Sequence, residues 1–375
     1  MTTKYINNNL LNEYKYLILE ENNLDDLEIF FEINYKGRGS YGSINYFKWK
    51  VFNNITKVGI IKCIYHENKI VSVTSITPKT LWINRERLNG AEIGDTYTSE
   101  QYQKKGLFSL LVNDARKWSQ ENGINIIYGT PNTQSINGYK KYADFFKNEN
   151  IELDTLIIPL NINLLLLPFL GKFISNFAAK LFYLFNKFRI KLIALSKKNK
   201  IKNLKSIVSI QELISSPIKF GNEWDNFFEK SRLQYNFILD RSAKSIDWRY
   251  FQNPNEYIIY IIKENNVLMG YLVLRILEEK EIKSLVIVDY LTLEKKEEYL
   301  VFVLNEIFNN KIDYSFKSIS LWCIRNSNFY RVFKDFGFFK ITKDSPIIFY
   351  NLFNLLILKR LKINWHFTIG DTDNI

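Results

Sequence analysis

Short runs of alternating apolar and polar residues occupy much of the chain, and polar turns separate them. The runs 58–65 (VGIIKCIY) and 70–76 (IVSVTSI) flank the turn 66–69 (HENK). Period-two alternation on both sides of a polar turn is typical of two antiparallel strands joined in a hairpin. The same arrangement recurs at 257–262 (YIIYII) and 267–276 (VLMGYLVLRI), around the turn KENN. We therefore predict a β-hairpin at each place.

A helix is predicted after the first hairpin. Apolar residues recur every three or four positions over 107–122, with charged residues opposite, and Gly123 follows. This spacing indicates an amphipathic helix that ends at a glycine. A strand at 92–98 precedes the helix and another at 125–128 follows it, so parallel pairing of these two strands is favoured.

Four landmarks occur twice in the same order, at a separation a little under two hundred residues. One match would be chance, whereas four in the same order indicate an internal duplication. The matching pairs are the two hairpins, WKVFNN (49–54) with WRYFQN (248–253), EIGDTYT (92–98) with VIVDYLT (286–292), and Asn132 and Tyr139 with Asn326 and Phe333. We predict a first domain at 1–150, an apolar helical connector at 151–206 and a second domain at 207–375.

The connector is very apolar, but polar residues and a proline interrupt it, so no membrane-spanning helix is predicted. Lysines lie to one side of a helical stripe. The stripe residues are Phe169, Phe173, Ile174, Phe177, Leu181, Leu184 and Phe188. We expect the stripe to pack between domains or subunits, and association with a membrane interface is the alternative.

Composition adds limits on partners and compartment. The length of 375 residues suits two domains, and 46% hydrophobic residues are ample for packed cores. The net charge of +12 favours anionic partners such as nucleotides, coenzyme phosphates, RNA or an acidic membrane surface, with solvated lysine faces as the alternative. Cys63 and Cys323 lie in apolar runs, which indicates buried thiols in a reducing compartment.

The N-terminal sequence MTTKYINNNLLNEYK lacks the apolar core of a signal peptide, so a cytoplasmic protein is expected. The chain has two histidines, His66 and His366. This number argues against a histidine-based metal site or catalytic triad, and no metal is predicted.

The segment 98–111, TSEQYQKKGLFSLL, holds the candidate chemistry. A strand ends there, a polar turn follows, and the predicted helix begins after Gly106. The first N–H groups of a helix and the positive end of its dipole attract anions, and a glycine lets a phosphate approach the backbone. Gln103, Lys104 and Lys105 would add donors and charge. Because many helices start after a polar turn of this kind, an ordinary helix start is the alternative.

The residues Gln103-x-x-Gly106-x-Phe108 resemble the Arg/Gln-x-x-Gly-x-Gly/Ala signature of the GNAT N-acyltransferase superfamily, in which this loop wraps the pyrophosphate of an acyl-coenzyme A. Phe108 stands where Gly or Ala is usual, which affects packing more than the backbone N–H groups that bind phosphate. The resemblance implies acyl-CoA as co-substrate. The residues that it implies for cofactor binding are Tyr97, Thr98, Gln103, Lys104, Lys105, Gly106, Leu107, Phe108, Asn132 and Ser135.

The segment 132–139 resembles the Asn-x-x-Ala-x-x-x-Tyr pattern of the same superfamily. The resemblance implies that Asn132 contacts the pantetheine arm and that Tyr139 is the general acid, which protonates the departing thiolate after an amine attacks the thioester. Simple packing of a helix is the alternative for Tyr139. Asp95 is a candidate base or holder of a water, with a structural role in the turn as its alternative, and Glu92 is a weaker candidate base.

Further segments resemble tandem-GNAT acyltransferases of surface-polysaccharide gene clusters. They are IIYGTPN (126–132), SINGYKKYADF (135–145), SIDWRYFQNP (245–254) and WHFTIGDTDNI (365–375). The resemblance implies an α/β (α+β) fold of two tandem GNAT-like domains, each a mixed, mostly antiparallel sheet flanked by helices. It implies transfer of an acetyl or short hydroxyacyl group, such as 3-hydroxybutanoyl, to the amine of a nucleotide-linked amino-deoxy sugar. The named example is dTDP-3-amino-3,6-dideoxy-galactose, for O-antigen or capsule synthesis.

The second copy lacks both chemical features of the first. The chain continues after VIVDYLT as LEKKEEYLVFVLNEIF, without a glycine in the turn and with glutamates where a pyrophosphate would lie, and Phe333 stands in place of Tyr139. We therefore predict one active site, in the first domain, with the second domain completing the acceptor pocket. The candidate pocket residues are Trp248, Arg249, Arg325, Tyr330, Trp365 and Asp373. Core packing is the alternative for Trp248, because Trp49 and Trp248 recur together.

Two other functions stay open. One is a tandem-GNAT transferase that uses aminoacyl-tRNA to extend peptidoglycan peptides, with which the charge of +12 is compatible. The other is a non-catalytic, membrane-associated binding protein. Gly106 and Tyr139, present in one copy and absent from the other, favour an acyl-CoA-dependent enzyme, acting as a monomer or homodimer without nucleic acid.

Overall fold

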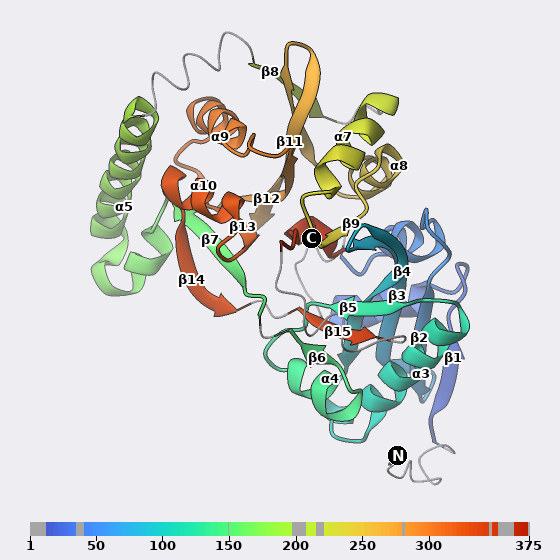
Figure 1. Ribbon diagram of the computed structural model, residues 1–375. Helices are drawn as coiled ribbons and strands as arrows, with labels where there is room; N and C mark the ends of the chain where they lie inside the picture. The colour runs from blue at the N-terminus through green and yellow to red at the C-terminus, as the bar shows by residue number, and fades with distance from the viewer. Residues whose placement is uncertain are drawn as a thin grey trace.

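The computed structural model describes residues 13–34, 41–148, 150–196, 208–214, 221–279, 282–344, 347–351 and 364–373. Two mixed β-sheets, each with helices packed on it, make up two domains that lie side by side (Figure 1). Antiparallel pairs predominate in both sheets. The predicted α/β fold of two tandem domains with mixed sheets is confirmed.

The first sheet has the strand order β1-β2-β3-β4-β5-β15-β6, and β9 pairs with the end of β3. Its strands are β1 (Lys15–Ile18), β2 (Ile60–His66), β3 (Lys69–Ile83), β4 (Glu86–Thr98), β5 (Ile126–Gly129), β6 (Phe146–Lys147), β9 (Phe237–Leu239) and β15 (Ile348–Asn351). The predicted hairpin is β2–β3. Its turn residues Glu67 and Asn68 both have positive φ, which the favoured two-residue hairpin turn requires.

The strands β4 and β5 pair in parallel, as the strand–helix–strand pattern predicts. Their crossover helix α3 ends one residue earlier than expected, and Gly123 beyond it has φ 72°. The helices and helical turns of the first domain are α1 (Asp25–Asn34), α2 (Ile44–Phe47), η2 (Lys48–Phe52), η3 (Glu100–Tyr102), α3 (Leu107–Glu121) and α4 (Ile136–Tyr142). The buried face of α3 includes Leu107, Leu111 and Ala115, so the predicted amphipathic helix is confirmed.

The second sheet has the strand order β14-β7-β13-β12-β11-β10-β8. Its strands are β7 (Leu153–Pro159), β8 (Val208–Ile214), β10 (Ile258–Glu264), β11 (Val267–Glu279), β12 (Ile282–Thr292), β13 (Phe316–Ile324) and β14 (Phe339–Asp344). The helices and helical turns beside it are α5 (Asn163–Ser196), α7 (Asn222–Arg232), α8 (Ala243–Ile246), η4 (Asp247–Phe251), α9 (Tyr299–Asn310), α10 (Asn328–Phe336) and η5 (Ile369–Asp371). The second hairpin, β10–β11, repeats the turn of the first, with positive φ at Asn265 and Asn266.

The two halves of the chain exchange strands. β7, which the sequence places in the connector, pairs with β13 and β14 of the second sheet. β15, from the second half, pairs with β5 and β6 of the first sheet. β9, also from the second half, pairs with β3 of the first sheet. The two sheets are therefore interlocked.

The duplicated WKVFNN and WRYFQN segments meet at the interface between the domains. Each forms a single π-helical turn, η2 or η4. The indole rings of Trp49 and Trp248 stack with their centroids 4.8 Å apart and an interplanar angle of 19°. Each indole N–H donates to the backbone oxygen of the other tryptophan. The repeat thus supplies a nearly two-fold symmetric contact between the domains.

The predicted apolar stripe lies on α5, but it faces solvent, and all seven of its residues are more than half exposed. The opposite side of the helix packs on the second domain, where Ser175, Ala179, Asn186 and Ile190 are buried. The stripe therefore does not pack between the domains, and packing between subunits stays a prediction. The buried side includes the polar residues Ser175 and Asn186, so the more apolar side of α5 is the exposed one, which the sequence pattern alone does not reveal. Within the described residues, no helix is both long and apolar enough to cross a bilayer.

Candidate active site

The first element of the site is the end of β4. Parallel pairing with β5 stops at Glu92, opposite Tyr128, yet β4 continues to Thr98. On its other edge β4 stays paired with β3, across a bulge at Asp95, which has φ 52°. Beyond Glu92, one edge of β4 therefore has no strand beside it in the described part of the chain. Backbone N–H and C=O groups on such an edge can bind a ligand.

Tyr139 reaches this part of β4 from α4. Its hydroxyl donates to Thr96 Oγ1 at 2.8 Å, and Thr96 Oγ1 lies 2.7 Å from Thr74 Oγ1 on β3. The Tyr139 ring is buried and lies edge-on to both Phe108 and Phe145. The phenol is thus held in one orientation beside the bulge. The sequence analysis did not identify Thr96, because nothing in the strand pattern marks one threonine as the partner of a distant tyrosine.

The predicted phosphate loop connects β4 to α3. Gly106 is the N-cap of α3 with φ 85°, and Lys104 also has positive φ. The first intrahelical hydrogen bond runs from Leu110 N–H to Gly106 C=O. The N–H groups of the first turn come before Leu110 and therefore have no acceptor within the helix. Lys104 and Lys105 are exposed, and the Gln103 amide donates to Thr98 C=O. The loop therefore presents N–H donors, a helix dipole and two cations to solvent.

Gly106 is required by its backbone angle and not by crowding. A Cβ at this position would meet no atom within 4 Å, whereas its φ lies in the left-handed region that side chains other than glycine avoid. Leu107, next along the chain, is buried in the domain core, and Thr98 and Tyr97 lie at the strand end before the loop. This arrangement leaves open space directly above the glycine.

Phe108 packs between α3 and α4. A Cβ on Gly138 would lie 2.9 Å from Phe108 Cε1, so the glycine in α4 makes room for the large ring. The Phe108 ring also supports the ring of Tyr139, at a centroid distance of 5.0 Å. Phe108 is larger than the Gly or Ala expected at this position, and it fits because residue 138 is a glycine.

Asn132 and Ser135 lie at the start of α4. Asn132 Oδ1 accepts hydrogen bonds from the backbone N–H of Gln134, and from the N–H and the hydroxyl of Ser135. The side-chain oxygen of Asn132 therefore stabilises the turn that carries Tyr139. The Asn132 side chain is exposed, and it lies on the same segment of the chain as Tyr139.

Asp95 lies within a buried ion pair. Lys50 Nζ is 2.9 Å from Asp95 Oδ2, and Ser75 donates to the same oxygen at 2.5 Å. Burial opposes the charge of Lys50, but Asp95, Glu92 and Asp373 together hold its pKa above the usual value. Both side chains of this ion pair are fully buried, at the bulge of β4.

Glu92 lies where the parallel strands separate. It is buried, Glu92 Oε2 accepts from the backbone N–H of Asp373, and burial followed by the neighbouring Asp373 carboxylate raises its pKa to about 8. Asp373 itself is paired with Lys79 at 2.6 Å, and the Lys79 ammonium lies 4.5 Å from the centre of the Trp248 ring. The sequence analysis missed Lys79, which occupies an apolar stretch of β3.

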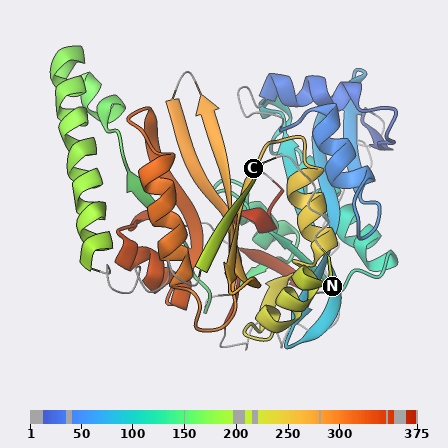
Figure 2. The same ribbon diagram turned by 90° about the horizontal axis from the view of Figure 1, so that it is seen from above.

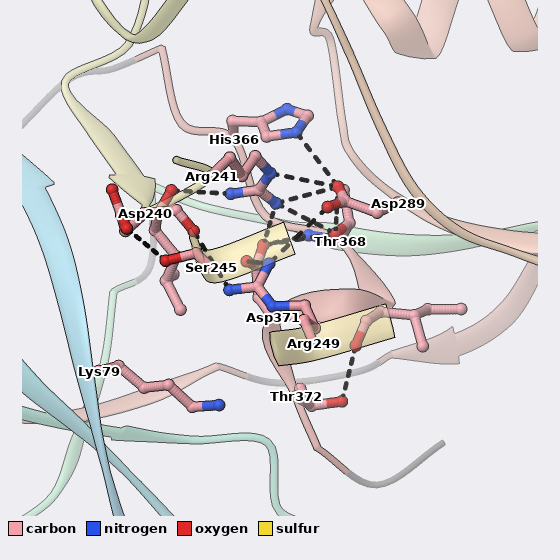
Figure 3. Close-up of polar contacts among 12 residues, drawn as sticks. Lys79, Asp240, Arg241, Ser245, Arg249, Asp289, His366, Thr368, Asp371 and Thr372 are labelled. Atoms are coloured by element: carbon pink, nitrogen blue, oxygen red, sulfur yellow. Dashed lines mark hydrogen bonds and ion pairs between the residues drawn. The ribbon is translucent and has the colours of Figure 1, made fainter. Parts of the chain in front are cut away.

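A second buried charge network holds the C-terminal segment between the domains (Figure 3). Arg241 contacts both Asp289 and Asp371, and Arg249 lies 3.7 Å from Asp289 and 3.5 Å from Asp371. Asp289 is thus the counterpart of Asp95, and Arg249 the counterpart of Lys50. A cavity of about 10 Å³ beside Arg249 and Asp373 has room for about one water. The sequence analysis missed Arg241 and Asp371.

The candidate pocket residues of the second domain do not gather around one open pocket. Trp248, Arg249 and Asp373 come together, but all three are buried in the domain interface. Trp365 is also buried and stacks on Phe237 at a centroid distance of 4.2 Å.

The two remaining pocket candidates belong to a separate cluster. Arg325 forms an ion pair with Asp154 at 2.7 Å, and Tyr330 lies near the same carboxylate, which is on β7. Their contacts tie β7 to the end of β13, so they stabilise the exchanged strand. The six residues therefore lie in separate groups, and their part in acceptor binding stays a prediction.

In the second copy, protein groups occupy the positions of the loop and the acid. Lys296 and Tyr299, before and at the start of α9, both bind Glu264, and Asn328 donates to Glu297. Phe333 is fully buried against Tyr290, which takes the place of Thr96. In the first copy the helix carries the phenol and the strand carries Thr96. In the second copy the strand β12 carries the phenol, Tyr290, and the helix α10 carries Phe333 at the matching position.

No group of three histidine, cysteine, aspartate or glutamate side chains among the described residues is placed to hold a metal ion. Cys63 and Cys323 are buried free thiols. The polar groups of the site are therefore hydroxyls, backbone amides and the charges of the loop.

Residues 27–143 match the family model of the acetyltransferase (GNAT) domain. None of the curated proteins compared with the chain matches it. The similar solved structures include a GCN5-related N-acetyltransferase from Anabaena variabilis, with a TM-score of 0.58 and 15% identity over 90% of this chain and 72% of that one. N-myristoyltransferase from Saccharomyces cerevisiae with bound myristoyl-CoA has a TM-score of 0.58 and 11% identity, over 90% of this chain and 79% of that one. A GCN5-related N-acetyltransferase from Kribbella flavida has a TM-score of 0.55 and 10% identity, over 90% and 72% of the two chains.

At these identities the likeness to solved structures establishes the fold, and the family model matches most of the first domain. The matched residues include the strand end, the loop and Tyr139. Residues 27–143 therefore resemble a GNAT acetyltransferase domain, within a chain that has a GNAT-like fold of two domains.

Proposed function

We propose that the chain is an acyl-CoA-dependent N-acyltransferase with one active site, in its first domain. The observation that carries the proposal is the Tyr139 hydroxyl, fixed on Thr96 at the free edge of β4, in the same domain as the loop at Gly106. The GNAT domain match supports acyl transfer, and the S. cerevisiae neighbour with bound myristoyl-CoA supports an acyl-CoA donor.

The loop would bind the pyrophosphate of the donor. Its first-turn N–H groups, together with Gln103, Lys104 and Lys105, supply donors and positive charge at one place. The pantetheine arm would then run along the free edge of β4 towards Thr96. Asn132 would meet it through its amide nitrogen, since its oxygen accepts hydrogen bonds from Gln134 and Ser135.

The reaction would proceed through a tetrahedral intermediate. The acceptor amine attacks the thioester carbon, and backbone N–H groups of β4 beyond Glu92 stabilise the oxyanion. The carbon–sulfur bond then breaks, and Tyr139 donates its proton to the departing thiolate. The amine releases its proton to water, and water then returns a proton to the Tyr139 phenolate. In this scheme Asp95 positions the bulge, because its carboxylate is paired with Lys50.

The proposed acceptor is a nucleotide-linked amino sugar, on the resemblance of the segments 126–145 and 245–254 to enzymes of surface-polysaccharide synthesis. The charge of +12 suits the diphosphate of such an acceptor. Burial of Trp248 and Trp365 argues against a direct role for these two rings in sugar binding.

The test is calorimetry with CoA, followed by thiol release from acetyl-CoA and 3-hydroxybutanoyl-CoA in the presence of dTDP- and UDP-linked amino sugars. We expect CoA binding, and thiol release that depends on the amino sugar. Absence of CoA binding would reject the donor. CoA binding without acyl transfer to any amino sugar would reject the acceptor while leaving the donor site intact, and transfer from aminoacyl-tRNA would reject acyl-CoA as the donor.

A further inference from the structure

The outer face of α5 is the largest group of exposed apolar side chains on one element of the described structure. Phe173 is 86% exposed and Phe169 is 83% exposed, on either side of the interruption at Gly171. From Phe173 to Phe188, after Gly171, the exposed residues recur mostly at spacings of three and four, which places them along one side of the helix. A large exposed apolar face of this kind marks a contact surface.

The helix holds this face in a fixed position. Tyr183 donates to Ile312 C=O, Asn186 to Pro159 C=O, and Arg189 to Gly337 C=O, all from the inner side of α5. In Figure 2 the helix lies at the outer edge of the second domain, on the side away from the first domain. The apolar face therefore points out of the molecule and away from the proposed active site.

The charges on α5 have one sign. The 34 residues of the helix include no Asp or Glu, and their five basic residues are Lys172, Lys180, Lys187, Arg189 and Lys191. Lys180, Lys187 and Lys191 are exposed, and their spacing of seven and four residues places them along one border of the apolar face. The next ten residues in the sequence, KKNKIKNLKS, add five lysines and no acid.

This combination points to one occupant. A second copy of α5 would bring lysines towards lysines, with no carboxylate on either helix to pair with them. A bilayer surface with anionic headgroups matches both properties at once, because phenylalanine and leucine side chains enter the acyl boundary while lysines contact lipid phosphates. We propose that α5 docks the protein on an anionic membrane surface, lying in the plane of the interface.

The proposal is tested with the full chain and two kinds of vesicle, phosphatidylcholine alone and an equal mixture of phosphatidylcholine and phosphatidylglycerol. We expect the protein to float with the mixed vesicles and to bind the neutral ones at least about tenfold more weakly. The double variant Phe173→Ser/Phe177→Ser should lose binding by about tenfold or more. The matched control is Ile29→Ser/Ile33→Ser, which removes two exposed apolar residues from α1 and should bind as the unchanged protein does.

The charge is tested separately. Lys180→Glu/Lys187→Glu should weaken binding to the mixed vesicles by about tenfold or more, whereas Lys230→Glu/Lys244→Glu on α7 and α8 should have little effect. Circular dichroism of each variant establishes that it is folded. Equal losses in the test and control variants would overturn the proposal. The proposal is also overturned if the protein binds neither kind of vesicle. Self-association that depends on Phe173, measured by sedimentation, would then identify a second copy of the chain as the occupant.

Discussion

Trp49 and Trp248 stack on each other at the domain interface, and each indole donates to the backbone oxygen of the other. They occupy the same position in the two copies of the repeat, so one sequence motif provides both halves of the contact. Lys79 lies over the Trp248 ring and pairs with Asp373, which links this contact to the C-terminal segment.

Trp248→Ala should destabilise the protein by about 3–5 kcal/mol, because it removes a buried indole that stacks on Trp49 and leaves a cavity at the interface. Urea unfolding followed by circular dichroism measures the change. Trp118→Ala, which removes a half-buried indole from α3, is the control and should have a smaller effect. Equal losses of stability would mean that the stacked pair has no special part in joining the domains.

Gly106→Glu should abolish CoA binding, because the new carboxylate lies at the N-terminus of α3, where the donor's pyrophosphate would bind. Gly123→Glu is a closely matched control at the other end of the same helix. Both glycines have positive φ, and a Cβ on either meets no atom within 4 Å. The two variants should therefore lose similar stability, and calorimetry should detect CoA binding only for Gly123→Glu. Normal binding by Gly106→Glu would show that the loop is an ordinary helix start.

Tyr139→Phe should lower turnover by about 10²- to 10⁴-fold, since it removes the proposed acid while keeping the ring against Phe108. CoA affinity should stay within about twofold, because the phenol is not part of the loop. The control is Tyr142→Phe, on the exposed side of the same helix. Thiol-release kinetics and calorimetry measure the two quantities, and an unchanged turnover would leave Tyr139 with a packing role alone.

Stability should depend on pH through Glu92. Its pKa is raised in the folded protein from about 4.5 to about 8, so the folded state keeps a proton that the unfolded state releases across this range. The contribution of Glu92 to stability is therefore lost progressively as pH rises from 4.5 to 8. Relative to Glu92→Gln, the unchanged protein should lose about 1 kcal/mol per pH unit between pH 5 and pH 8. Denaturant unfolding at several pH values measures this slope.

Glu86→Gln, at the exposed start of the same strand, is the control for Glu92 and should give a curve parallel to that of the unchanged protein. If the Glu92→Gln curve were parallel as well, Glu92 would be ionised in the folded protein at neutral pH. Its carboxylate would then have to be stabilised by Lys50 and Lys79 more strongly than burial opposes it.

Local patterns were sufficient for much of the fold. The hairpins, the helix before Gly123 and the parallel pair β4–β5 follow from alternation, helical spacing and chain order, all of which are properties of neighbouring residues. The loop at Gly106 was located in the same way, from a strand end, a polar turn and the start of a helix. Its role and that of Tyr139 as site residues stay predictions.

Relationships between distant segments could not be predicted in this way. The strand β7 reads as part of an apolar connector because its partner, β13, lies far along the chain. The apolar stripe of α5 predicts a buried face, whereas the buried side of the helix holds Asn186 and Arg189, which donate to distant backbone oxygens that the local pattern does not reveal. Similarly, nothing near Phe108 in the sequence indicates that Gly138 makes room for its ring.

The exchange of strands also bears on how the protein is synthesised. β15 covers the edge of β5, yet more than two hundred residues separate the two strands. At about 5–20 residues per second, a ribosome needs on the order of ten seconds or more to supply the missing strand. During that time the nascent first domain has an uncovered β-strand edge, which is a site for aggregation. Slower growth at low temperature, or a chaperone that binds the emerging chain, should therefore raise the yield of folded protein.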